Sequence, residues 1–88
     1  MELAEIRREI DAIDEELVKL FVRRMRCADR VAEAKGASGK AVLDSVREAE
    51  VLDRAVQAAG PDCADDVRQF FAGLMSVSRA RQNRKLAR

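Results

Sequence analysis

The chain has 88 residues, which is enough for one small domain, and a domain of this size is only marginally stable alone. Apolar residues make up 48% of it, which excludes a disordered composition, and the net charge of +1 disfavours a general nucleic-acid binder. There is no histidine, and Cys27 and Cys63 form no CxxC pair, so no metal site is expected.

The first predicted helix runs from about residue 2 to residue 35. Neither glycine nor proline interrupts it, and Gly36 is expected to follow its end and open a flexible loop over residues 36–39. Its apolar positions recur at the three- and four-residue steps of a helix: Ile6, Ile10, Ile13, Leu17, Leu20, Phe21, Ala28 and Val31.

Two shorter helices are predicted after the loop. The second begins near residue 44, where Ser45 and Glu48 have the spacing of a capping box, and it stops at Gly60-Pro61. Asp62 is expected to cap the third, which continues to the end of the chain and becomes basic from Arg79 onwards. The sequence therefore predicts a single all-α domain over residues 1–88, with three helices, one of them very long.

The length of the first helix predicts an oligomer. A helix over residues 2–35 is about 50 Å long, whereas a compact domain of this size has a radius of gyration of about 12 Å. The rest of the chain cannot cover the whole apolar stripe, so we expect a second copy to pack against it antiparallel, in an intertwined homodimer. An ordinary coiled coil is the less favoured alternative, because the stripe lacks strict heptads with leucine at d.

Two cations interrupt the apolar stripe. Arg24 and Lys35 are eleven residues apart, so they share one helix face on either side of Ala28, with Cα atoms about 16 Å apart. Either carboxylates of the other helices neutralise them, or together they bind a small anion. Arg7 lies about 25 Å before Arg24 along the axis, so it can reach such a site only in a partner chain.

Other polar side chains are placed to join this site. Ser78 and Gln82 are four residues apart and project side by side from the third helix. Arg47 and Glu48 lie in the first turn of the second helix, beside the glycine-containing loop. Glu48 has two possible roles, either in the capping box or as an acceptor for a ligand hydroxyl.

These residues carry a resemblance to a known family. IRREIDAIDEELVKLFVRRM, VAEAK ending at Lys35, DSVRE beginning at Asp44 and SRARQ ending at Gln82 resemble, in order, the all-helical chorismate mutases, which are intertwined three-helix dimers. The resemblance spans nearly the whole chain and implies rearrangement of chorismate to prephenate in aromatic amino-acid biosynthesis. This reaction needs neither a cofactor nor a metal, which agrees with a chain that has no histidine.

The resemblance also implies a role for each site residue. Arg24 looks like the carboxylate-binding arginine, and Arg7 like the arginine donated across the dimer. Lys35 and Gln82 look like the pair that hydrogen-bonds the ether oxygen, so Lys35, Gln82 and Arg24 are the expected catalytic residues. Further expected contacts are the ring-hydroxyl acceptor Glu48, the carboxylate-end residues Arg47 and Ser78, the loop-side residue Asp44, and the apolar wall residue Val31.

Alternatives come from the same scaffold and from another class. The site could serve an isochorismate-pyruvate lyase or a mutase of 4-amino-4-deoxychorismate; Glu48 favours a hydroxyl at C4 and hence chorismate. A non-enzymatic helical interaction module, binding nucleic acid through the basic tail over residues 79–88, is a distant third. The charged N-terminus, the absence of a membrane-length apolar run and the two unpaired cysteines lead us to expect a cytoplasmic protein.

Overall fold

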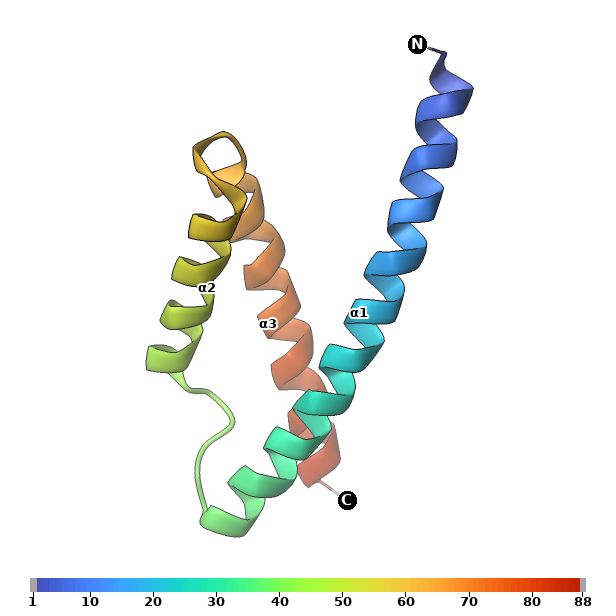
Figure 1. Cartoon of the computed structure of the whole chain (residues 1–88). Helices are drawn as coiled ribbons and strands as arrows, with labels where there is room; N and C mark the ends of the chain where they lie inside the picture. The colour runs from blue at the N-terminus through green and yellow to red at the C-terminus, as the bar shows by residue number, and fades with distance from the viewer. Residues whose placement is uncertain (1, 88) are drawn as a thin grey trace.

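The fold consists of three α-helices and one short 3-10 turn (Figure 1), in a computed structural model that describes residues 2–87. Helix α1 spans Leu3–Ser38, α2 spans Ser45–Ala59 and α3 spans Ala64–Leu86, with the turn η1 at Pro61–Cys63. The prediction of an all-α chain with one very long helix is confirmed.

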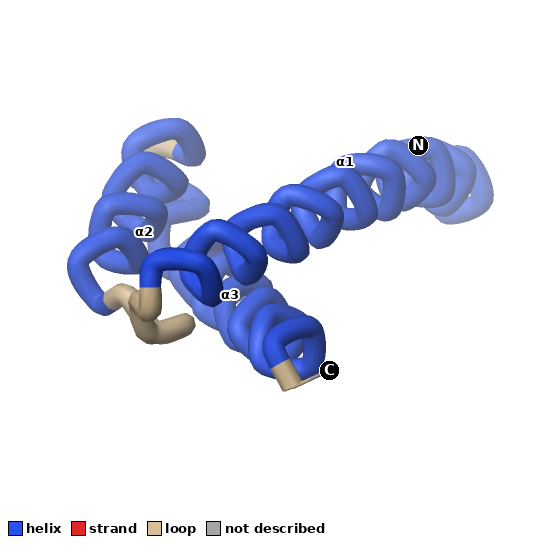
Figure 2. The backbone as a smooth tube through the Cα atoms, turned by 90° about the horizontal axis from the view of Figure 1, so that it is seen from below, coloured by secondary structure: helices blue, strands red, loops and turns tan. Residues whose placement is uncertain are grey.

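Helix α3 holds the chain together, because it packs against both α1 and α2. The first half of α1 extends away from the other two helices, which gives the molecule the outline of an open V (Figures 1 and 2). The radius of gyration is 15.9 Å and the principal extents are 54 × 28 × 14 Å, so the chain is much less compact than an ordinary domain of its length.

The buried centre lies where α1 meets α3. Small side chains on α1 let the two helices approach closely, and Ala32 is fully buried. Within residues 2–87, two of the six buried residues are polar, which is unusual in so small a core. The buried residues are Met25, Ala28 and Ala32 on α1, and Met75, Ser78 and Gln82 on α3.

The end of α1 differs from the prediction. Gly36 does not end the helix; it lies inside the last turn, where a Cβ would come within 2.9 Å of Leu86 Cδ2 on α3. The helix continues to Ser38, and Gly39, at φ 73°, is the residue that ends it by donating its N–H to the Lys35 carbonyl. The expected loop over residues 36–39 is therefore mostly helix, and this extends the face that carries Lys35.

The starts of α2 and α3 also differ from the prediction. The N-cap of α2 is Asp44, whose Oδ1 accepts a hydrogen bond from the Arg47 N–H at 3.0 Å, so the capping box of Ser45 with Glu48 is wrong. Asp62 does not cap α3, because η1 intervenes and α3 begins at Ala64. Both neighbours Asp44 and Ser45 are good cap residues, and the shift of one position frees the Glu48 side chain for other partners.

The apolar stripe of α1 is largely uncovered, as its length predicts. Nine large apolar side chains between residues 3 and 22 are 36–60% exposed. Four of them (Leu17, Val18, Leu20 and Phe21) line an open groove of about 390 Å³ together with Arg24 and with Phe70, Phe71 and Leu74 of α3. Within residues 2–87, no helix combines the length and the hydropathy needed to cross a membrane.

Candidate active site

A cavity of about 270 Å³ lies among the three helices and receives the two cations of the α1 stripe. Arg24, Ala28, Val31 and Lys35 line it from α1, as their helical spacing predicts. Arg24 also lines the apolar groove next to the cavity, so it stands on the wall that separates the two. Arg24 and Lys35 thus line the same cavity.

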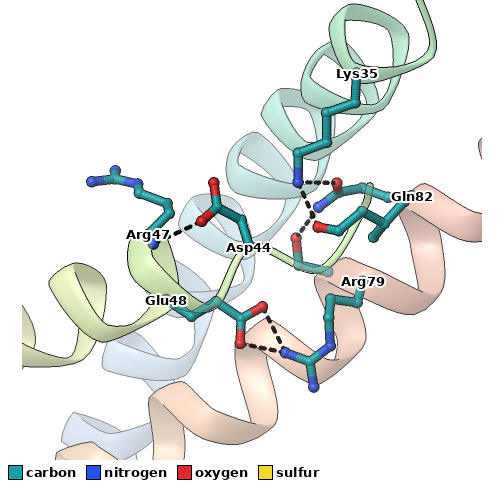
Figure 3. A network of polar contacts seen from close by, with 8 residues as sticks. Lys35, Asp44, Arg47, Glu48, Arg79 and Gln82 are labelled. Atoms are coloured by element: carbon teal, nitrogen blue, oxygen red, sulfur yellow. Dashed lines mark hydrogen bonds and ion pairs between the residues drawn. The ribbon is translucent and has the colours of Figure 1, made fainter. Parts of the chain in front are cut away.

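A chain of hydrogen bonds crosses the cavity from α1 to α3 (Figure 3). Lys35 Nζ donates to Gln82 Oε1 at 3.4 Å, and Gln82 Nε2 donates to Ser78 Oγ at 3.2 Å. Because these partners fix the amide of the buried Gln82, one hydrogen of its NH₂ group remains free to bind a ligand. The i, i+4 pair on α3 is thus joined to the α1 lysine.

Lys35 also holds the loop between α1 and α2. Its Nζ donates to the Val42 carbonyl at 2.5 Å, while Val42 itself lines the cavity. An ammonium group has three hydrogens, so these two bonds leave one donor available. The same side chain therefore orders the loop and points a charge into the cavity.

Helix α2 and its cap contribute Asp44, Arg47 and Glu48 to the lining. Asp44 uses one carboxylate oxygen to cap α2. The Arg47 side chain is 55% exposed; its guanidinium lies 3.9 Å from Glu50 and is directed away from the Lys35–Gln82 pair (Figure 3). Glu48 points toward α3 instead of back to its own helix end. The structure thus brings all three to the cavity, with Arg47 at its outer edge.

Arg79 is a cavity residue that the sequence interpretation missed, since it assigns this arginine only to the basic tail. Its Nη1 donates to both Glu48 oxygens, at 2.5 and 2.7 Å, and it lines the cavity beside Ser78. Its partner is 31 residues away, so no local spacing signals the pair; position next to Ser78 in SRARQ is the one available hint.

The charges of the lining favour an anion. Four cations (Arg24, Lys35, Arg47 and Arg79) face two carboxylates, which leaves an excess of two positive charges. Among residues 2–87, no carboxylate lies within ion-pair distance of Arg24 or Lys35. The interpretation that carboxylates of the other helices neutralise these two cations is therefore wrong, and the cavity suits a small dianion.

Arg7 and the basic tail residues Arg81, Arg84 and Lys85 lie outside the cavity. Arg7 is exposed and absent from the lining, as its distance of about 25 Å from Arg24 along α1 requires. On the tail, Arg81 pairs with Asp29 at 2.7 and 2.9 Å and Lys85 pairs with Glu33 at 3.5 Å. These pairs, together with Arg79–Glu48, tie the tail to the other helices and leave less of it for nucleic acid.

Comparison with known proteins places the chain in a family. Residues 6–83 match the family described as chorismate mutase type II. "Intracellular chorismate mutase" of Mycolicibacterium smegmatis is 34% identical over 64 residues, which are 73% of this chain and 62% of that protein. "Chorismate mutase" of Methanocaldococcus jannaschii is 44% identical over 52 residues, 59% of this chain and 52% of that protein.

A third relative is larger. The "Bifunctional chorismate mutase/prephenate dehydratase" of Aquifex aeolicus is 38% identical over 53 residues, 60% of this chain but 15% of that protein. The alignments thus span less than two thirds of the length of each of these relatives. No solved structure matches the chain. Because the family match covers most of the sequence and the fold is three helices, the chain belongs to the type II chorismate mutase family.

Proposed function

We propose that this protein rearranges chorismate to prephenate and so serves the synthesis of aromatic amino acids. The observation that carries the proposal is the pair of cations without carboxylate partners, Arg24 and Lys35, facing the buried Gln82 across a cavity with two excess positive charges. Chorismate carries two carboxylates. Family membership and the names of the relatives support the same assignment.

The reaction suits what these side chains can do. The C–O ether bond breaks while a C–C bond forms within one molecule, so no nucleophile or proton carrier on the protein is needed. Lys35 and Gln82 each retain one free hydrogen, and both can donate to the ether oxygen as negative charge grows there. Arg24 suits a carboxylate because its guanidinium fork binds two oxygens at once. Holding the substrate in its compact conformer supplies the remaining acceleration.

The proposal assigns the remaining lining residues to binding. Glu48 accepts a hydrogen bond from the ring hydroxyl with the oxygen lone pairs that Arg79 leaves free. Ser78 and Arg47 contact the carboxylate ends, Asp44 makes a loop-side contact, and Val31 forms part of the apolar wall.

We also propose that the active unit is an antiparallel homodimer. The exposed stripe of α1 is apolar and continuous with the apolar groove between α1 and α3. The α1 helix of a second copy can fill this groove and cover the stripe at the same time. Since Arg24 lies on the wall between groove and cavity, a helix seated in the groove passes next to the site. The Arg7 side chain of that helix then completes the carboxylate pocket.

The cytoplasm is the proposed location. Cys27 and Cys63 are both free and exposed, which suits a reducing compartment. One relative carries the word intracellular in its name.

The first experiment follows the ultraviolet absorbance of chorismate in the presence of the protein. Lys35→Ala is expected to lower kcat by about a hundred- to a thousandfold, which is the usual effect of losing one such donor. Lys85→Ala is the matched control, because Lys85 also joins α3 to α1 but lies outside the cavity. Turnover of isochorismate in place of chorismate, or full activity in Lys35→Ala, would contradict the proposal.

A subunit-exchange experiment tests the shared site. Homodimers of Arg7→Ala and of Lys35→Ala are each expected to be nearly inactive, whereas a mixed dimer has one site with both residues intact. Activity should therefore return when the two inactive proteins are unfolded together and refolded. If the mixture stays as inactive as its components, Arg7 does not act across the dimer.

A further inference from the structure

Arg79 on α3 and Glu48 on α2 form an ion pair, and both residues line the cavity. No other ion pair within residues 2–87 has both of its members in the cavity lining. A single guanidinium nitrogen lies between the two carboxylate oxygens, at 2.5 and 2.7 Å (Figure 3). The side chains are 33% and 24% exposed, so both are largely shielded from water. The comparable pairs Arg81–Asp29 and Lys85–Glu33 lie outside the cavity.

We propose that Arg79 is a positioning residue that sets substrate specificity through Glu48: it makes this end of the cavity accept an uncharged hydroxyl and reject a charged amine. The proposal rests on the proposed function, because it concerns the substituent that Glu48 binds on the ring of the substrate. This role of Arg79 would make the protein prefer chorismate over its 4-amino analogue, a choice that the sequence alone leaves open.

The geometry leaves Glu48 able to accept a hydrogen bond. An ionised carboxylate has about four lone-pair positions, and the nitrogen of Arg79 occupies the two that face each other. The outer positions remain for a donor on the ligand. The carboxylate is also held in one orientation by two bonds from a separate helix, so it is preorganised before a substrate arrives.

The charge of the pair decides which donor is preferred. A hydroxyl is neutral, so its hydrogen bond to the carboxylate changes much less than the attraction of a charged donor when the carboxylate is neutralised nearby. An aliphatic amine has a pKa of about 10, close to that of lysine, and is charged at neutral pH. Beside a bare carboxylate the ammonium would be attracted, but here the guanidinium of Arg79 neutralises the carboxylate and cancels that attraction.

A merely structural role is the competing explanation, since the pair also joins α2 to α3. Such a role would lower activity toward both substrates together, through loss of folded protein or displacement of α2. A specificity role changes the ratio of kcat/KM between the two substrates. This ratio separates the two explanations without depending on the amount of folded enzyme.

The test measures kcat/KM for chorismate and for 4-amino-4-deoxychorismate with the unmodified protein and four variants. Arg79→Gln is expected to shift the preference toward the amine by about tenfold or more, the Coulomb effect of one charge at close range. Arg79→Lys, which keeps the charge, should restore the preference for chorismate. Arg81→Gln removes a well-formed pair of the same helix outside the cavity and should leave the ratio unchanged.

Glu48→Gln supplies an independent arm if Arg79→Gln does not fold. It leaves the Arg79 charge uncancelled, so the preference should move in the opposite direction, further against the amine. Equal losses for both substrates in Arg79→Gln, or the same shift in Arg81→Gln, would overturn the role of Arg79 while chorismate turnover still stood. If the unmodified protein turned over neither substrate, the proposed function would fail, and the role of Arg79 with it.

Discussion

The exposed stripe of α1 leads to a quantitative prediction for Leu17. This residue lines the apolar groove and is 46% exposed in the single chain. Fully burying a leucine side chain contributes about 1.5–3 kcal/mol, so burying the remaining half contributes about 1 kcal/mol. In the proposed dimer a two-fold axis places every contact of the interface twice, so Leu17→Ala should weaken association by about 2 kcal/mol, which is about a thirtyfold rise in Kd.

Sedimentation equilibrium over a range of protein concentrations measures this Kd directly. Leu43→Ala is the matched control, because Leu43 is 58% exposed but lies in the loop before α2, outside the groove. The control should associate like the unmodified protein. A monomeric unmodified protein at every concentration, or equal Kd values for Leu17→Ala and the control, would refute the assignment of the groove to a second copy.

Two further predictions concern stability, measured by urea unfolding. Two hydrogen bonds from the Arg81 guanidinium hold the pKa of Asp29 below its ordinary value of 3.8, so Asp29 stabilises the fold above that pH and loses this effect as the pH falls through its lowered value. Asp29→Asn should therefore be less stable than the unmodified protein at about pH 7 and equal to it in strong acid; a deficit that persisted in acid would rule out the charge as its cause. Gly36→Ala should stabilise α1 by up to about 1 kcal/mol, because position 36 is helical and the atom close to it is the end of the flexible Leu86 side chain. Gly39→Ala should destabilise α1 by about 1 kcal/mol, because Gly39 has φ 73°. Stability changes of the same sign in both variants would contradict the observed end of the helix.

Helical periodicity accounts for the part of the fold and site that sequence could predict. It places Arg24 and Lys35 on one face because the rise and rotation per residue are fixed by the backbone, and it places Ser78 beside Gln82 for the same reason. The length of α1 likewise implies that its apolar stripe outruns the rest of the chain, and the exposed side chains of residues 3–22 confirm it.

The helix ends and the Glu48 partner could not be predicted in this way. Gly36 and Gly39 are both suitable C-terminal glycines, and the choice depends on whether the intervening turn packs against α3. Asp44 and Ser45 are adjacent and both suit an N-cap. Arg79 lies about 100° around α3 from Ser78, so its partner is set by the position of α2 in space, which local spacing does not encode.

Arg24 lies on the wall shared by the cavity and the apolar groove, and this position has a consequence for how the protein behaves in solution. In the proposed dimer, Arg24 contacts the substrate on one side of this wall and borders the second copy on the other, so the activity of each chain depends on the protein concentration. As the solution is diluted below the dissociation constant, each separated chain loses both its cover and the Arg7 of its partner. Turnover per chain should then fall with dilution, in a curve that follows the monomer–dimer equilibrium and recovers when the protein is concentrated again.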